Sequence, residues 1–592
     1  MFRVHIWSVI NISIVSVFYM LYMNASFPQV GHDYAYFMPR IFDTYLHYQV
    51  NGISIQWYTP SFGGGLPAFA NPQQIQFSLI QLLSAFINPW QASLSAVAVF
   101  LCIGYLSTFS LAHHTLKIRS FGAHLSALFF IANGFYIQHM AVGHVGFQTF
   151  MLLPLLFLFI LDSRLPLVAS VILMGLSASL VLHSAGFYMI VYFILSINIL
   201  LPFIYLISVP VEPITNVIKR LTLGIIIFLG VSLSKLYAVT SLMRLFPRVV
   251  MDSYPVNWLM GLCGMLFQYI GVMLSAPFLL LIDKSPMNYV GLLYTLIGAN
   301  HGFWELDMSL SPALWILLLI GGIGLLLKPQ GNFAFSRKKI LLVIWLLIAV
   351  YLLMSFTLAK GELFHVLSRL PVLRSLHVNP RFASAGILPL ALLGGLIFDK
   401  LVTRRFSERI TLTMYLVLSA LSLASLWSYF TLPLELSYRS FDITQIEDLY
   451  ADFQEERDAY AVNKIVPNIK DYEVFRAKAS NLNIVEPVFG YNLGQYSPNL
   501  IAGSPYKTAG DYFNFTNPAC LVYPNENDCQ PFDRVRVNDR DNLEKLLNRQ
   551  QPDWRIPLVQ SISNVISIAT LVICFVLLSF FAVRYRLDPR SS

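Results

Sequence analysis

The sequence predicts an all-α polytopic membrane protein with a small extracytoplasmic α/β domain before its last helix. Of its 592 residues, 56% are hydrophobic and only 12% are charged, which is about half the charged fraction of a soluble domain. Apolar runs of about 20 residues, the length that crosses a bilayer, recur along the chain. The tract 431–555 breaks this pattern, because it is rich in Asp, Glu, Asn and Pro and has no such run.

About twelve segments are predicted as membrane spans. They are 5–23, 92–112, 121–138, 147–161, 166–183, 187–208, 221–240, 310–327, 339–357, 382–398, 410–430 and 556–583. The N-terminal segment lacks a small-residue cleavage site, so we interpret it as a retained first span. Basic residues gather in the loops on one side, which the positive-inside rule assigns to the cytoplasm. Both termini are therefore predicted to be cytoplasmic.

The opposite side carries a first loop (24–91), a middle loop (241–309) and a shorter loop (358–381). Three units are predicted: a transmembrane domain (1–430), an extracytoplasmic domain (431–555), and a last transmembrane helix with a cytoplasmic tail (556–592). The middle loop contains "NWLMGLCGMLFQYIGVMLSAPFLLLI", which is apolar enough to span. A span there would place the basic loop 328–339 outside, so a re-entrant or interfacial segment is preferred.

Charge and cysteine usage exclude some classes of partner. The net charge of +8 lies in short loops between apolar runs, with no basic patch or motif for nucleic acid. Cys520 and Cys529 are close together in the polar tract, which predicts a disulfide and an oxidising compartment. No second CxxC or histidine cluster accompanies them, so the sequence predicts no metal site.

The first loop begins with "VGHDYAYFMPR" (30–40). Residues 33–48 are predicted to form a helix on the membrane surface. Its polar residues share one face at spacings of three and four: Asp33, Tyr36, Arg40, Asp43 and His47. Purely structural roles would explain three of these residues. Asp33 would be a helix N-cap, and Arg40 and Asp43 would form a surface ion pair. The glycines of "WYTPSFGGGLPAFANPQQ" (57–74) indicate a tight turn, because no Gly-Lys-Ser/Thr accompanies them.

These motifs resemble the first outer loop of YfhO-like bacterial membrane proteins, which are similar to GT-C class glycosyltransferases. The resemblance covers "GHDYAYFMPR", "QWYTPSFGGGLPAFANPQQ", "HVLSRLPVLRSLHVNPRFASAGILPLALLGGLIFDKL" (365–401), "VEPVFGYN" and "FTNPACLVYPNENDCQPFD". Because these segments occur in the same order along the chain, the resemblance is more specific than a match to any one segment. His377 and Asn379 depart from it, because a more basic stretch is expected there.

The resemblance implies an inverting glycosyltransferase with a GT-C-like fold in the bacterial plasma membrane. The donor would be a polyprenyl-phosphate-linked sugar, and the acceptor a lipid, a surface polymer or a protein; no cofactor is expected. GT-C enzymes need an acidic residue in the first outer loop, and Asp33 takes that place, where a carboxylate can accept the acceptor's proton. Asp43, Glu305 and Asp307 are candidates for a second acid.

Cations on the outer side are candidates for binding the donor phosphate, because Arg suits bidentate phosphate recognition. They are Arg381, Arg374, Lys360 and Arg244. Contact with lipid headgroups is the simpler interpretation of each, least so for Arg381, which lies in the family-like "NPRF". His139 and His144 could contribute to a pocket, although an interfacial role is more usual than metal binding. Lys235 lies inside a predicted span, where a cation is costly.

Two other functions remain open at this point. An O-antigen polymerase or ligase would place its main residues in later loops. A transporter would show paired halves and interrupted helices, and the sequence contains no internal repeat.

Overall fold

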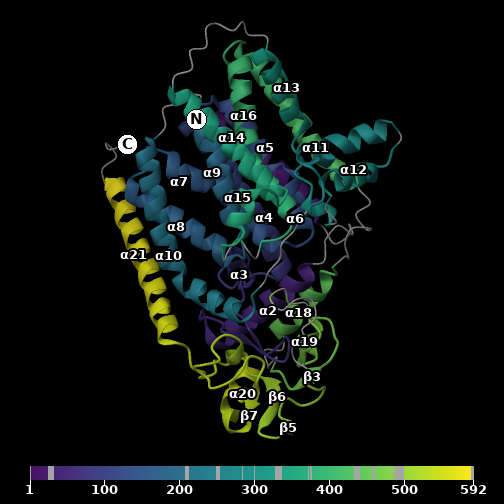
Figure 1. Ribbon diagram of the computed structural model, residues 1–592, viewed down its shortest axis with the longest axis vertical. Coiled ribbons are helices and arrows are strands. Elements are labelled where there is room, and N and C mark those ends of the chain that lie inside the picture. The colour runs from purple at the N-terminus through teal and green to yellow at the C-terminus, as the bar shows by residue number, and fades with distance from the viewer. Residues whose placement is uncertain are drawn as a thin grey trace.

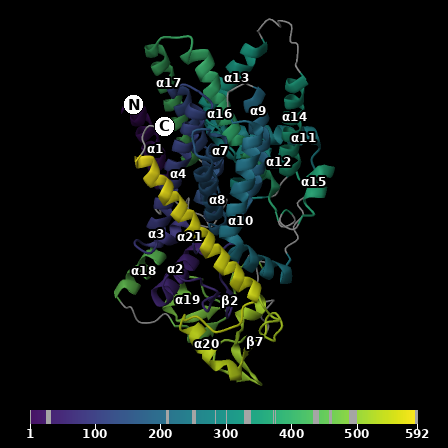
Figure 2. The same cartoon turned by 90° about the vertical axis from the view of Figure 1, so that its left-hand side faces the viewer.

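The structure is a computed structural model, and it describes residues 2–23, 33–206, 212–247, 254–282, 284–298, 301–326, 337–370, 373, 376–431, 441–455, 461–484, 486, 488 and 499–587. Helices form an elongated bundle, and the part that contains the strands lies at one end (Figure 1). α1 begins and α21 ends toward the opposite end in both views (Figures 1 and 2).

Apolar sequence explains the helices of the bundle, since backbone groups in a membrane must be paired within the segment. The bundle elements are α1 (Phe2–Tyr22), α4 (Pro89–Ser110), α5 (Ser120–Ile131), α6 (Gly134–Ala141), η2 (Val145–Leu152), α7 (Leu153–Leu161), α8 (Leu167–His183), α9 (Tyr188–Leu206), α10 (Ile214–Leu245), α11 (Trp258–Leu281), α12 (Met287–Ile297), α13 (Pro312–Leu326), α14 (Arg337–Thr357), α16 (Ile387–Phe398), α17 (Glu408–Ser425) and α21 (Leu558–Leu587).

Nine helices in the described part of the chain are long and apolar enough to span a membrane. Eight of them coincide with predicted spans, and the four other predicted spans are shorter apolar helices. The ninth is α11, the middle-loop segment that the charge distribution predicts to be re-entrant or interfacial. It qualifies as a span by length and composition, but its backbone is broken at Gly271. The count of twelve spans therefore stays a prediction.

The first loop and the C-terminal tract form one part, which the sequence predicts to lie outside and which we call the outer part. The first loop gives α2 (Tyr34–Asn51), a two-stranded antiparallel sheet of β1 (Tyr58–Thr59) and β2 (Leu66–Pro67), and α3 (Leu79–Leu83). The tract gives α18 (Thr444–Glu455), the parallel pair β3 (Lys464–Val466) and β4 (Ala479–Asn481), α19 (Glu473–Arg476), the antiparallel order β5 (Thr508–Ala509)–β6 (Tyr512–Thr516)–β7 (Arg534–Arg536), and α20 (Arg540–Leu547).

The two segments of the outer part share a hydrophobic core. Tyr58 of β1 packs edge-on against Trp554, with ring centroids 5.3 Å apart. The predicted tight turn lies between β1 and β2, where Gly64 and Gly65 have φ values of 69° and 113°. A Cβ on Gly65 would lie 2.8 Å from the carbonyl oxygen of Thr516 in β6. Glycine is therefore needed both for the backbone angle and for the close approach of β6.

α2 is not the surface helix that the sequence predicts. Tyr34 and residues 36–47 are buried, because α18 and α19 cover the helix. The ring of Phe42 lies 4.9 Å from that of Phe475, and the ring of Tyr45 lies 5.3 Å from that of Tyr450. An apolar helix face that looks suited to lipid is covered here by protein from the far end of the chain.

The charged residues of α2 are also buried, so the expected surface ion pair of Arg40 and Asp43 is wrong. Arg40 lies 3.3 Å from Glu486 and 3.4 Å from Asp471, measured between nitrogen and oxygen. Asp43 pairs with Arg549. Burial alone would raise the pKa of Asp43, but the charge of Arg549 holds the pKa below its usual value. These pairs fasten the first loop to the C-terminal tract.

The predicted topology can be tested by cysteine labelling in intact cells. We expect a membrane-impermeant thiol reagent to modify a cysteine placed at Lys507, in the outer part. A cysteine at Ser407, between Arg405 and Arg409, is expected to react only after permeabilisation, because basic loops stay cytoplasmic. Both positions are exposed, so accessibility within the protein does not limit the reaction. Labelling at Ser407 but not at Lys507 in intact cells would reverse the orientation.

A second prediction concerns the disulfide of the outer part. The structure joins Cys520 and Cys529, whose Cα atoms lie 5.8 Å apart. We expect peptides from non-reduced protein to contain the two residues as a linked pair, since the charge distribution predicts that this side faces an oxidising compartment. Mass spectrometry with and without reductant measures this. Two free thiols in freshly isolated protein would contradict both the pairing and the assigned side.

Candidate active site

The turn between α6 and η2 carries two of the candidate residues, His139 and His144. His139 lies on α6, and His144 directly precedes η2. Between them Gly143 has a φ of 84°, and a Cβ on Gly143 would lie 2.4 Å from the backbone nitrogen of Tyr34. Because only a glycine leaves this space, the start of α2 can approach the turn.

Asp33 is positioned at this approach by its backbone. Its N–H donates to the carbonyl of Val142 at 3.1 Å. Its side chain makes no hydrogen bond that caps α2, and Oδ2 lies 3.2 Å from Nε2 of His144. The interpretation of Asp33 as a simple N-cap is therefore wrong.

Glu305 comes from the middle loop, at the end of η3 (Phe303–Glu305). The residues that follow are fastened to α11, since the N–H of Met308 donates to the carbonyl of Gln268 at 3.1 Å. This contact lies beside the break at Gly271, where a Cβ would clash with Ser309. The irregular backbone of both segments thus holds Glu305 against the bundle.

Arg381 comes from η5 (Asn379–Gly386), the "NPRF" segment before α16. The preceding Val378 has a φ of 58°, which costs a β-branched residue about 1–3 kcal/mol. The Cζ atom of Arg381 lies 5.2 Å from the ring centroid of Phe147 and 5.5 Å from that of Tyr188. These aromatic faces favour a cation at this position.

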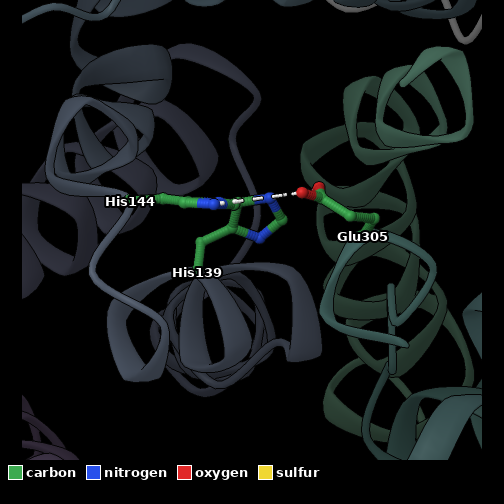
Figure 3. A group of neighbouring side chains, drawn as sticks. All are labelled: His139, His144 and Glu305. Carbon is green, nitrogen blue, oxygen red and sulfur yellow. Dashed lines mark ion pairs between the residues drawn. The ribbon is translucent and has the colours of Figure 1, made fainter. Parts of the chain in front are cut away.

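Five side chains meet where these segments converge, and we call them the Glu305 cluster: Asp33, His139, His144, Glu305 and Arg381. Two nitrogens of Arg381, Nε and Nη2, donate to the two carboxylate oxygens of Glu305. His139 Nε2 lies 3.3 Å from Glu305 Oε2, and His144 Nε2 lies 3.9 Å from Glu305 Oε1. Figure 3 shows the two imidazoles directed toward the Glu305 carboxylate from the other side of the site.

Exposure and charge differ within the Glu305 cluster. The side chain of Asp33 is 40% exposed, whereas that of His144 is 9% exposed and that of Glu305 only 6%. Burial alone would raise the pKa of Glu305, but the charge and hydrogen bonds of Arg381 hold the pKa well below its usual value. Glu305 is therefore an ionised partner of Arg381, and Asp33 is the accessible carboxylate of the cluster.

The other candidate acids lie elsewhere. Asp43 belongs to the contact between α2 and Arg549. Asp307 is fully buried; it accepts hydrogen bonds from Ser309 and, at 2.7 Å, from the hydroxyl of Tyr429. Burial raises the pKa of Asp307. Of the three proposed second acids, the fold brings only Glu305 to Asp33.

The remaining candidate cations are separate from the cluster. Arg244 is exposed in the last turn of α10, and Lys360 is partly buried after α14. In the described part of the chain, Glu305 forms its arginine ion pair with Arg381 and not with Arg244. Arg374 lies outside the described residues. Binding of the donor phosphate by any of these residues, or by Arg381, stays a prediction.

Three basic residues are buried more deeply than their positions in the sequence indicate. His139 and His144 are buried in the cluster and do not lie at the membrane interface. Their spacing of five residues does not indicate that Glu305, from the middle loop, lies next to them. Lys235 is 1% exposed and does not reach the lipid surface. Its Nζ donates to the carbonyls of Phe69 and Asn71 at 2.7 and 2.8 Å, so it fastens the first loop to α10.

Comparisons with known proteins give the following results. No protein-family model and no curated protein matches the sequence. The crystal structure of ArnT from Cupriavidus metallidurans bound to undecaprenyl phosphate is similar, with a TM-score of 0.36 and 14% identity over 83% of this chain and 90% of that chain. The structure of apo ArnT has a TM-score of 0.37 and 15% identity, over 80% and 85% of the two chains. Membership of the YfhO-like family stays a prediction.

Proposed function

We propose that this chain is a membrane glycosyltransferase in which Asp33 accepts the proton of the acceptor. The donor is a sugar on a polyprenyl phosphate, and the acceptor is a lipid, a surface polymer or a protein at the outer face of the plasma membrane. The observation that carries the proposal is the setting of Asp33, a 40% exposed carboxylate beside buried His, Glu and Arg side chains.

The place of the cluster in the molecule suits a lipid-linked donor. α2, which begins beside Asp33, lies between the helices of the bundle and the strands in both views (Figures 1 and 2). A polyprenyl chain stays in the bilayer while its phosphate and sugar emerge at the boundary. A base at that boundary can therefore meet both the donor's sugar and an acceptor from outside.

The reaction assigned to this site is a single displacement. The acceptor's hydroxyl oxygen attacks the anomeric carbon, the bond from that carbon to the phosphate oxygen breaks, and the acceptor's proton passes to Asp33. Polyprenyl phosphate leaves with the bonding electrons, and the configuration of the sugar is inverted. General base catalysis of this kind contributes about 10²–10⁴-fold to the rate.

His144 and Glu305 have supporting roles in this proposal. His144 lies within 3.2 Å of the carboxylate of Asp33 and orients it toward the exposed side. Glu305 holds Arg381 in place through two hydrogen bonds, which keeps a positive charge near the position of the leaving phosphate. Such fixed charges stabilise the developing charge of a leaving group.

A reconstituted assay tests the proposal directly. Purified protein in lipid vesicles would receive sugars labelled on polyprenyl phosphate, together with an extract of membrane lipids and envelope polymers. We expect acceptor-dependent release of polyprenyl monophosphate. Release of polyprenyl diphosphate from a diphosphate donor would favour the polymerase or ligase alternative, and no consumption of either donor would refute both.

A further inference from the structure

We infer that His139, His144 and Glu305 bind a divalent metal ion, most suitably Zn²⁺, with Asp33 beside the open coordination position. The potential ligand atoms of the first three residues lie within 4.8 Å of one another, and all three residues are buried. Figure 3 shows the two imidazoles on one side and the Glu305 carboxylate facing them from the other. Two histidines with one carboxylate form a ligand set that zinc uses where a position stays open.

The protonation of His139 is the first argument. Its Nδ1 lies 2.7 Å from the carbonyl oxygen of Phe135, and a carbonyl can only accept. Nδ1 therefore carries the proton, and in the neutral ring Nε2 presents a lone pair to the carboxylate of Glu305. Among the described residues Nε2 has no hydrogen-bond partner, although Glu305 Oε2 is only 3.3 Å away. Two lone pairs that face each other in a buried site repel, and a metal ion bound between them would remove this repulsion.

The spacing of the atoms is the second argument. Zinc bonds of about 2.0–2.1 Å in tetrahedral geometry place two ligand atoms roughly 3.3–3.4 Å apart. His139 and Glu305 already have this separation at 3.3 Å. His144 lies 3.9 Å from Glu305, and no two ligand atoms are more than 4.8 Å apart, so a bound ion would need to shorten these separations by up to about 1.5 Å.

The charges are the third argument. Asp33 and Glu305 carry two negative charges, and Arg381 offsets one of them. A divalent ion would leave the cluster with one net positive charge, which an anionic oxygen such as that of a phosphate can neutralise. Arg381 would then act as the group that orients a ligating carboxylate, a role that hydrogen-bonding partners of metal ligands commonly have.

The sequence shows no metal-ligand pattern because His139 and His144 follow the third predicted span, whereas Glu305 belongs to the middle loop. Only folding brings them together. The inference does not depend on the proposed transfer reaction, since metal binding is measured without any substrate.

Zinc and cobalt uptake test the inference. Protein purified through a tag without histidines, stripped with chelator and dialysed, would be loaded with Zn²⁺ alone. We expect about one ion per chain by mass spectrometry and a higher melting temperature with Zn²⁺, since a ligand of the folded state stabilises it. Co²⁺ in the same site is expected to give the intense visible absorption of tetrahedral coordination.

The double variant His139→Gln/His144→Gln should lose both the uptake of Zn²⁺ and the increase in melting temperature. His113→Gln with His114→Gln is the matched control, because these adjacent histidines lie in the segment after α4, outside the cluster, and should keep both. Equal uptake in the cluster variant and the wild type would overturn the inference. A wild-type protein that binds no Zn²⁺, or whose Co²⁺ spectrum is pale and octahedral, would also overturn the inference. In that case a protonated His139 would donate to Glu305 instead of a metal ion binding between them. The wild-type results decide the matter even if the variant does not fold.

Discussion

Replacing Asp33 by asparagine should lower turnover about a hundredfold or more while the protein folds normally. The substitution keeps the size of the side chain and removes the base. Little stability should be lost, because the Asp33 side chain makes no cap bond to α2 and is 40% exposed. Release of polyprenyl phosphate by equal amounts of reconstituted protein measures the effect, with melting temperature recorded beside it.

Asp452→Asn is the matched control for this experiment. Asp452 lies on α18 in the outer part, and its ion pair with Arg476 is exposed, so the change should affect neither turnover nor stability. A stable and fully active Asp33→Asn protein would end the assignment of Asp33 as base. A loss of activity that follows a matching loss of folded protein would assign Asp33 a structural role.

Arg381→Ala is expected to destabilise the protein by about 3–5 kcal/mol, because it leaves the ionised carboxylate of Glu305 buried without its partner. The double variant Arg381→Met with Glu305→Gln removes both charges and should recover most of that loss. Arg244→Ala, at an exposed arginine outside the cluster, should cost little. Thermal unfolding in the same detergent compares the four proteins.

The double variant also separates stability from function. If it recovers stability but transfers no sugar, the pair acts in the site and is more than a structural contact. A double variant that is as unstable as Arg381→Ala would show that the loss has another cause, such as packing on Phe147 and Tyr188. A double variant with full activity would remove Arg381 from donor binding and Glu305 from the site.

The apolar helices could be predicted because they depend on local composition. A run of about 20 apolar residues is stable in a bilayer whatever its neighbours are. All twelve predicted spans correspond to apolar helices in the described part of the chain. Asp33, Glu305 and Arg381 could also be named singly, from their motifs and from the scarcity of charge.

What the sequence could not determine is which charges meet. The polar stripe of α2 has the spacing of a surface helix, yet Arg40 and Asp43 are neutralised by Glu486 and Arg549 from the far end of the chain. The same holds for the site, where Asp33, His139 and Glu305 belong to three segments distant in sequence. Whether a charge is solvated or paired depends on contacts between residues that are hundreds of positions apart. The spacing of residues within one segment does not indicate such contacts. The sequence by itself therefore determined the membrane bundle and the individual candidates, whereas the tertiary structure decided the burial of α2 and the composition of the Glu305 cluster.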